Sequence, residues 1–179
     1  MSEVPYAGRG ATVWLTGLSG SGKSTIAEMV HRDLSAAGVA TYILDGDVLR
    51  RGLNADLGFS AADRAENVRR VGQVARLLCD AGLIVLVPVI SPYRQDRSTV
   101  KSFHTEARLP FYEIYVATPL AVCEERDPKG LYAQARAGKI RNFTGVSDPY
   151  EIPLNPDLMI DTSHMTPDAA AAAVIEILG

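Results

Sequence analysis

Residues 17–25 read GLSGSGKST, and this short loop restricts the fold more than any other part of the chain. It fits the pattern G-x-x-x-x-G-K-[ST], with Gly17, Gly22, Lys23 and Ser24 in the required positions. Glycines let backbone N–H groups surround phosphate oxygens, the lysine brings a positive charge to the β- and γ-phosphates, and the serine hydroxyl can ligate Mg²⁺. An apolar run precedes the loop and a stretch with helical spacing follows it, so a helix N-terminus would face the anion. The sequence therefore predicts a nucleotide-phosphate site rather than a chance glycine-rich turn.

The order of segments predicts an α/β fold. Apolar runs alternate with longer amphipathic stretches, which is typical of a parallel sheet of about five strands flanked by helices on both faces. Strands are expected at residues 12–16, 41–44, 83–89, 111–116 and 157–160. Helices are expected at residues 23–37, 63–81, 92–107, 119–126 and 167–178. The second helix is expected to begin with Asp63 as its N-cap and Glu66 completing a capping box. Residues 1–179 are expected to form one domain.

Composition excludes several classes of function. A net charge of −3 gives no overall attraction to nucleic acid. The most apolar run, residues 83–90, is too short to cross a bilayer, and the first ten residues lack the apolar region of a signal peptide. Cys79 and Cys123 have neither metal-ligand nor CxxC spacing, so buried free thiols are expected. From the composition we expect a cytoplasmic protein that binds neither nucleic acid nor membranes.

Ligands in parallel sheets bind beyond the carboxyl ends of the strands, so residues that follow each strand are candidates. Asp45 and Asp47 follow the second strand. One carboxylate can hold Mg²⁺ and the other can accept a proton from an attacking hydroxyl, although both could belong to a polar turn that caps the next helix. Arg50 and Arg64 suit a second anionic ligand because guanidinium binds phosphate or sulfate bidentately, the alternative being a solvated basic face.

Two later segments also carry candidates. Ser91 follows the third strand, where it could be a helix N-cap before Pro92, a ligand contact or a phosphorylation site, and the first two interpretations are favoured. Residues 128–150 combine basic side chains with three glycines, a composition that fits a lid closing on polyphosphate and excluding water. Within it Phe143 is a candidate ring for stacking on a base, unless the segment is a surface hairpin with one tucked aromatic.

Taken together, these segments resemble the adenylylsulfate kinases, a family of P-loop kinases. The joint occurrence of the motifs is far more specific than the phosphate loop alone. The resembling segments are WLTGLSGSGKST (14–25), LDGD (44–47), RRGLN (50–54), LGFSAADRAENVRR (57–70), ISPYR (90–94), CEERDPKGLYAQARAGKIRNFTG (123–145) and DPYEIP (148–153).

The resemblance implies an ATP-dependent kinase of sulfate assimilation. The reaction would transfer the γ-phosphate of ATP to the 3′-hydroxyl of adenylyl sulfate, with Mg²⁺, giving 3′-phosphoadenylyl sulfate. The catalytic residues would be Asp47 as base, Lys23, Asp45 and Lys129, although the roles of the two aspartates could be exchanged. The metal-side residues would be Ser24 and Asp45.

The resemblance also implies the two sets of nucleotide contacts. The ATP contacts would be Gly17, Leu18, Ser19, Gly20, Ser21, Gly22, Lys23, Ser24 and Thr25. Apart from the resemblance, Arg126 and the segment near Thr162 are candidates for contact with the ATP adenine. The adenylyl sulfate contacts would be Asp47, Arg50, Phe59, Arg64, Asn67, Ile90, Ser91, Lys129 and Phe143. A homodimer is a further implication of the resemblance. Work within a larger sulfate-activating assembly, with an ATP sulfurylase as partner, stays open as a separate alternative.

Two other functions stay open at this point. One is another small-molecule or nucleoside monophosphate kinase on the same scaffold, which would leave Phe59, Phe143 and the ISPYR motif unexplained. The other is a regulatory module that binds ATP without turnover, which the intact Lys23, Asp45 and Asp47 argue against.

Overall fold

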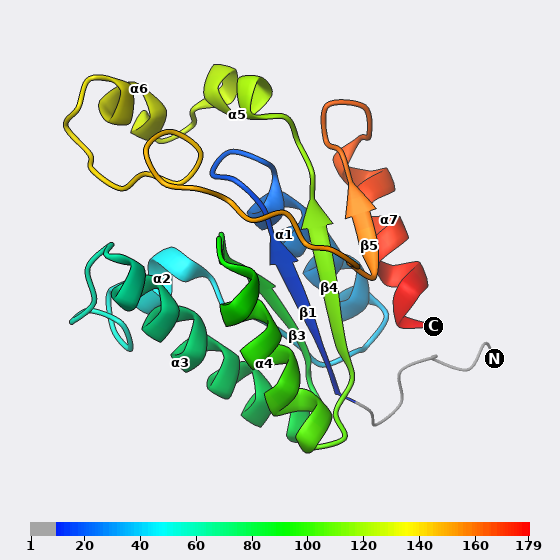
Figure 1. The fold of residues 1–179 in the computed structure, drawn as a ribbon. Coiled ribbons are helices and arrows are strands. Elements are labelled where there is room, and N and C mark those ends of the chain that lie inside the picture. The colour runs from blue at the N-terminus through cyan, green and yellow to red at the C-terminus, as the bar shows by residue number, and fades with distance from the viewer. Residues whose placement is uncertain (1–9) are drawn as a thin grey trace.

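The structure is a computed structural model that describes residues 10–179. Its centre is a five-stranded parallel sheet in the order β2-β3-β1-β4-β5 (Figure 1). The strands are β1 (Ala11–Thr16), β2 (Thr41–Ile43), β3 (Ile84–Pro88), β4 (Phe111–Val116) and β5 (Leu158–Ile160). The helices are α1 (Lys23–Ala36), α2 (Gly46–Arg50), α3 (Ala61–Asp80), α4 (Arg94–Glu106), α5 (Leu120–Arg126), α6 (Leu131–Arg136) and α7 (Pro167–Leu178). The predicted α/β fold is confirmed.

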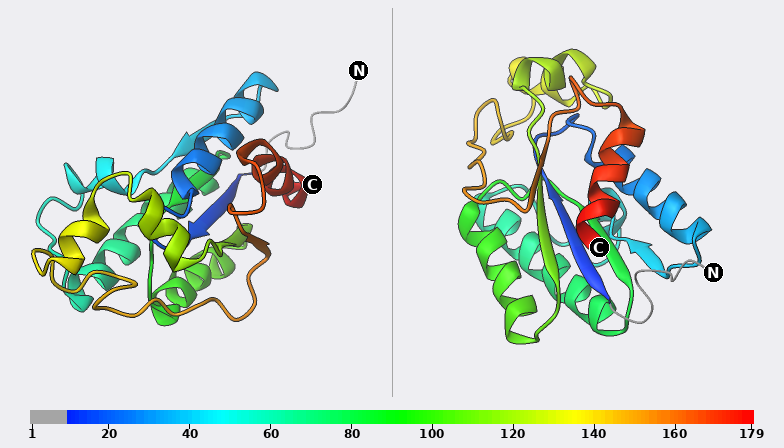
Figure 2. Two further views of the ribbon diagram at one scale, coloured as in Figure 1. Left: turned by 90° about the horizontal axis from the view of Figure 1, so that it is seen from above. Right: turned by 90° about the vertical axis from the view of Figure 1, so that its right-hand side faces the viewer.

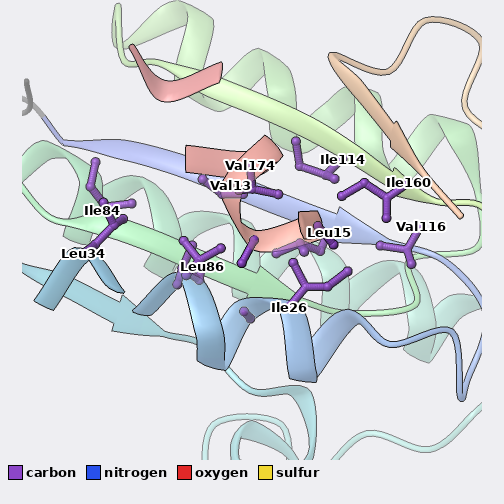
Figure 3. Close-up of a cluster of buried hydrophobic side chains, with 14 of the residues drawn as sticks. Val13, Leu15, Ile26, Leu34, Ile84, Leu86, Ile114, Val116, Ile160 and Val174 are labelled. Atoms are coloured by element: carbon purple, nitrogen blue, oxygen red, sulfur yellow. The ribbon is translucent and has the colours of Figure 1, made fainter. Parts of the chain in front are cut away.

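Helices cover both faces of the sheet, as Figure 2 shows, with α1 and α7 on one side and α3 and α4 on the other. The alternation of side chains along β1 explains the two cores. Val13 and Leu15 pack with α1 and α7 in the cluster drawn in Figure 3, whereas Trp14 packs with α3 and α4. Because β1 is buried on both faces, it is a fixed base for the loop that follows it.

The start of α3 differs from the prediction. Ser60, rather than Asp63, is the N-cap, and its hydroxyl accepts a hydrogen bond from Asp63 N. Asp63 returns the bond by accepting from Ser60 N, so the capping box is formed by Ser60 and Asp63 and not by Asp63 and Glu66. Ser60 is the N-cap because its backbone is extended and its side chain reaches the backbone N–H of the third helical residue, Asp63.

The start of α4 is also different. The helix begins at Arg94 with Tyr93 as the N-cap residue, so the prediction that Ser91 caps a helix beginning at Pro92 is wrong. Two short helices, α2 and α6, were absent from the predicted set because five or six residues are too few to show a helical period. No helix within residues 10–179 is long and apolar enough to cross a membrane. Separately, Cys79 and Cys123 are both buried free thiols, which agrees with the prediction for them.

Candidate active site

A cavity of about 1180 Å³ lies at the carboxyl ends of the strands. It joins the phosphate loop, α2, the start of α3, the turn after β3 and the predicted lid. The predicted site residues that line it are Ser19, Gly20, Gly22, Lys23, Ser24, Thr25, Asp45, Asp47, Arg50, Phe59, Arg64, Asn67, Ile90, Ser91, Arg126, Lys129 and Phe143. Gly17, Leu18 and Ser21 lie outside this lining, and Leu18 instead lines a second, shallower hollow of about 640 Å³.

The phosphate loop needs its glycines for both space and backbone angle. A Cβ on Gly17 would lie 2.5 Å from the carbonyl oxygen of Val116, and Gly22 has a φ of 101° immediately before α1. No side chain caps α1, so the N–H groups of its first turn are free to bind an anion. The geometry required for phosphate binding is therefore present.

Lys23 is buried inside this loop. Its Nζ donates to Leu18 O at 2.6 Å and to Ser21 Oγ at 3.3 Å. Burial lowers the pKa of Lys23 to about 8, since a charged amine loses hydration there. A phosphate beside the amine would supply the missing opposite charge.

Arg126 and Thr162 lie together beside the phosphate loop. Arg126 donates from Nη1 to Thr162 Oγ1 at 2.7 Å and from Nη2 to Thr162 O at 3.0 Å, and both residues line the cavity. The Thr162 hydroxyl in turn donates to Ser21 O at 2.9 Å. This links the carboxyl end of β5 to the phosphate loop, and the predicted contact with the ATP adenine remains a prediction.

The two aspartates have different partners. Asp45 is the N-cap of α2, and its Oδ1 accepts from Asp47 N at 2.9 Å and from Val48 N at 3.0 Å. The carboxylate of Asp47 instead forms an ion pair with the amine of Lys129, which belongs to the lid. The helix-cap alternative is therefore correct for Asp45 alone.

Phe59 lies beside Arg50 and Arg64 in the part of the cavity wall formed by α2 and the start of α3. The Arg50 guanidinium lies 4.3 Å from the centre of the Phe59 ring, and that of Arg64 lies 5.8 Å away. Phe59 is 58% exposed, whereas Arg64 is buried. Burial, followed by the neighbouring charge of Arg64, lowers the pKa of Arg50. Two cations held this close favour an anionic ligand.

Arg64 also connects the start of α3 to the lid. Its Nε donates to Phe59 O at 3.1 Å and its Nη2 donates to Asn142 O at 2.7 Å. One turn further along α3, Asn67 Oδ1 accepts from the buried Asn54 Nδ2 at 3.0 Å, which leaves the NH₂ group of Asn67 available. The orienting role of Asn54 was not predicted, and its place in the RRGLN motif was the only signal for it.

The predicted lid, residues 128–150, packs against α5 in a small hydrophobic cluster and is not a solvated surface hairpin. Phe143 is buried in a cluster with Cys123, Tyr132 and Ala135, and its ring meets that of Tyr132 edge-on with centres 5.0 Å apart. Part of Phe143 still lines the cavity. The ring of Phe143 is therefore packed against α6 on one side and still borders the cavity on another.

Ser91 is buried at the end of β3 and not at a helix terminus. Its hydroxyl accepts from Trp14 Nε1 at 3.1 Å and donates to Thr16 Oγ1 at 2.9 Å. Trp14 and Thr16 were not predicted as site residues, because their contact with Ser91 depends on the pairing of β1 with β3. The phosphorylation of Ser91 remains an untested prediction.

Comparison with known proteins now adds to the geometry. The family described as adenylylsulphate kinase matches residues 9–161. The chain belongs to this family. An adenylyl-sulfate kinase of Geotalea daltonii is 53% identical over 163 residues, which cover 91% of this chain and 79% of that protein. The bifunctional enzyme CysN/CysC of Mycobacterium tuberculosis is 56% identical over 170 residues, covering 95% of this chain.

This chain spans only 28% of the length of that bifunctional relative. Among solved structures, the M. tuberculosis APS kinase CysC in complex with AMPPNP and APS has a TM-score of 0.93 and 55% identity, covering 95% of this chain and 98% of that one. A hexameric APS kinase from Thiobacillus denitrificans has a TM-score of 0.70 and 36% identity, covering 95% of this chain and 29% of that one. Membership of the adenylylsulphate kinase family, predicted from the motifs, is confirmed.

Proposed function

We propose that this protein is an adenylyl-sulfate kinase, which transfers the γ-phosphate of ATP to the 3′-hydroxyl of adenylyl sulfate. One observation carries the proposal: a single cavity is lined both by a phosphate loop and by the Arg50–Phe59–Arg64 group, with Asp47 and Lys129 in the same wall. A kinase for a nucleotide acceptor needs two nucleotide sites that meet at the reacting phosphoryl group. The similarity to a relative solved with AMPPNP and APS supports this assignment.

Catalysis would rest mainly on positioning and charge, because the phosphoryl transition state spreads negative charge over its equatorial oxygens. The amides of the loop, Lys23 and the lid cation Lys129 supply the opposing field. The 3′-oxygen attacks the γ-phosphorus, the bond from that phosphorus to the β–γ bridging oxygen breaks, and ADP leaves. Asp47 accepts the proton of the 3′-hydroxyl, since Asp45 is engaged at the N-terminus of α2.

The acceptor nucleotide would be held by the remaining groups of the wall. The exposed ring of Phe59 offers a stacking surface for the adenine, with Phe143 as the second ring. Arg50 and Arg64 bind the phosphosulfate, and the free amide NH₂ of Asn67 donates to it or to the ribose. Ile90 and Ser91 form the adjacent wall.

The oxygen donors of the cavity fit Mg²⁺. Residues 10–179 contain no group of three or more His, Cys, Asp and Glu side chains arranged as a metal site, but Ser24 and Asp45 both line the cavity beside the phosphate loop. Mg²⁺ prefers hard oxygen ligands and usually keeps water and substrate phosphates in its shell. Ser24 and Asp45 would hold the ion, whose charge neutralises the β- and γ-phosphates.

The proposal also includes the state of the protein in the cell. A homodimer and a cytoplasmic location are predictions from the family resemblance and the composition, and association with an ATP sulfurylase is the separate alternative. Light scattering of the purified chain would test the first of them.

The deciding experiment is a coupled ADP-release assay with adenylyl sulfate, AMP and gluconate as alternative acceptors. We expect ADP release with adenylyl sulfate and background rates with the other two, and ³¹P NMR should place the new phosphate on the 3′-oxygen. A Lys23→Met variant serves as the control for contaminating kinases. Absence of adenylyl-sulfate-dependent ADP release from folded protein would overturn the proposal.

A further inference from the structure

The turn formed by Ile90 and Ser91 has a backbone that needs outside support. Ser91 has a φ of 41°, in the left-handed region that residues with a side chain rarely adopt. Strained residues of this kind persist only where their surroundings hold them. Both residues line the cavity, so whatever holds the turn also determines the shape of the acceptor side.

Arg97 on α4 supplies much of that support. Its side chain is only 3% exposed and lies outside the cavity lining. From this buried position Nη1 donates to Ser91 O at 2.6 Å, Nε to Glu113 Oε1 at 2.8 Å and Nη2 to Glu151 O at 2.6 Å. A guanidinium is a rigid planar fork, so its bonds to Glu113 and Glu151 fix the direction of the bond to Ser91.

The same arginine connects the turn to the segment that leaves the lid. Glu151 follows the lid directly, and besides its bond from Arg97 its backbone N donates to Pro92 O at 2.8 Å. Tyr93 donates from its hydroxyl to Asp148 Oδ2 at 2.7 Å. The carboxyl-terminal end of the lid is therefore attached to the residues immediately after the strained turn.

The start of the phosphate loop is attached at the same place. Thr16, the last residue of β1, donates from Oγ1 to Ile90 O at 2.7 Å and is 2.9 Å from the hydroxyl of Tyr150. The Arg97 guanidinium lies 5.7 Å from the centre of the Tyr150 ring. The turn, the end of the lid and the end of β1 therefore meet around one buried charge.

We propose that Arg97 is a positioning residue of the acceptor site: it holds the Ile90–Ser91 turn in place and links it to the end of the lid. This inference rests on the proposed function, because it assigns the turn to the acceptor nucleotide. Loss of Arg97 should weaken acceptor binding while donor binding at the phosphate loop is retained. A merely structural role would instead lower the amount of folded enzyme and leave the KM of the remaining fraction unchanged.

The test compares Arg97→Met, Arg97→Lys and Glu113→Gln with the unmodified protein. For Arg97→Met we expect KM for adenylyl sulfate to rise roughly tenfold or more while KM for ATP stays within about twofold. Lysine keeps the positive charge but cannot reproduce the three-way fork, so Arg97→Lys should raise the KM for adenylyl sulfate less than Arg97→Met does. Glu113→Gln keeps the arginine and its bonds to both carbonyls, so it should show the smallest rise.

Thr12→Val is the matched control, because it removes a buried hydrogen bond to His104 in which neither Arg97 nor a residue of the turn takes part. We expect this variant to have a lower Tm and an unchanged KM for both substrates. Folded Arg97→Met with an acceptor KM within about twofold of the unmodified protein, or with both KM values raised in parallel, would overturn the inference. If Arg97→Met does not fold, Arg97→Lys is judged by the same two criteria.

Failure of the proposed function gives a different result. An unmodified protein without adenylyl-sulfate-dependent ADP release would overturn the function itself. An active unmodified protein with kinetically normal Arg97 variants would overturn only the positioning role.

Discussion

Replacement of Asp47 by asparagine should lower kcat strongly while changing the free energy of unfolding very little. Asp47→Asn keeps the size of the side chain but removes its charge and its ability to accept a proton. The N-terminus of α2 should be unaffected, because Asp45 provides the cap and Asp47 contributes only its backbone N–H. The ion pair that is lost joins side chains of Asp47 and Lys129 that are 60% and 55% exposed. Exposed pairs contribute about 0–1 kcal/mol, so the free energy of unfolding should change little.

The effect on turnover should be much larger. Loss of a positioned proton acceptor lowers kcat by roughly 10²–10⁴-fold. At about 1.36 kcal/mol for each factor of ten, this corresponds to an activation barrier raised by roughly 2.7–5.4 kcal/mol. The expected catalytic loss therefore exceeds the expected loss of stability several times over.

The assay is ADP release at saturating ATP, adenylyl sulfate and Mg²⁺, with thermal unfolding of the same samples. Asp45→Asn is the matched control, since asparagine is as good an N-cap as aspartate and can accept the same two backbone hydrogen bonds. If Asp45 is the metal-side residue, its variant should need more Mg²⁺ for half-maximal rate and should recover when Mg²⁺ is added. Added Mg²⁺ should not rescue Asp47→Asn.

Two outcomes would refute this reasoning. One is an Asp47→Asn enzyme whose kcat lies within about threefold of the unmodified protein. The other is the reverse pattern, in which Asp45→Asn abolishes turnover at every Mg²⁺ concentration and Asp47→Asn responds to the metal. The second result would exchange the roles of the two aspartates.

Three further predictions concern buried groups. Burial lowers the pKa of His104 below its usual value of about 6.5, so the stability contributed by the neutral ring is present above that pH and is lost as pH falls. Between about pH 8 and 5.5 the Tm of His104→Gln should therefore fall less than the Tm of the unmodified protein, and an equal fall would contradict this. The pKa of Lys23 is about 8, and a bound phosphate should raise it again, so ATP binding near pH 8 should take up roughly half a proton. Calorimetry in two buffers of different ionisation enthalpy should detect this proton uptake, and a binding heat that does not depend on the buffer would argue against it. Phe143→Ala should weaken adenylyl sulfate binding more than ATP binding in equilibrium titrations, whereas equal losses would count against the stacking role.

Much of the fold could be predicted because its signals are local. Each predicted strand overlaps an observed one. The clearest case is residues 84–88, because a strand buried on both faces reads as a continuous apolar run. The errors lie where competing local signals differ by small energies. Ser60 and Asp63 can both cap a helix, and α2 and α6 are too short to reveal a period.

The sequence by itself determined the phosphate loop, because its glycines, Lys23 and the following helix are neighbours along the chain and interact at short range. It also determined the family, since motifs from residue 14 to 153 are read directly from the order of residues. Only the tertiary structure decided how Asp45 differs from Asp47, because the partner of Asp47 is 82 residues away on the lid. Likewise the burial of Ser91 and its support by Arg97 depend on β1, β4 and the end of the lid meeting in space. Contacts of this kind follow from how the strands and helices pack, and no local pattern encodes them.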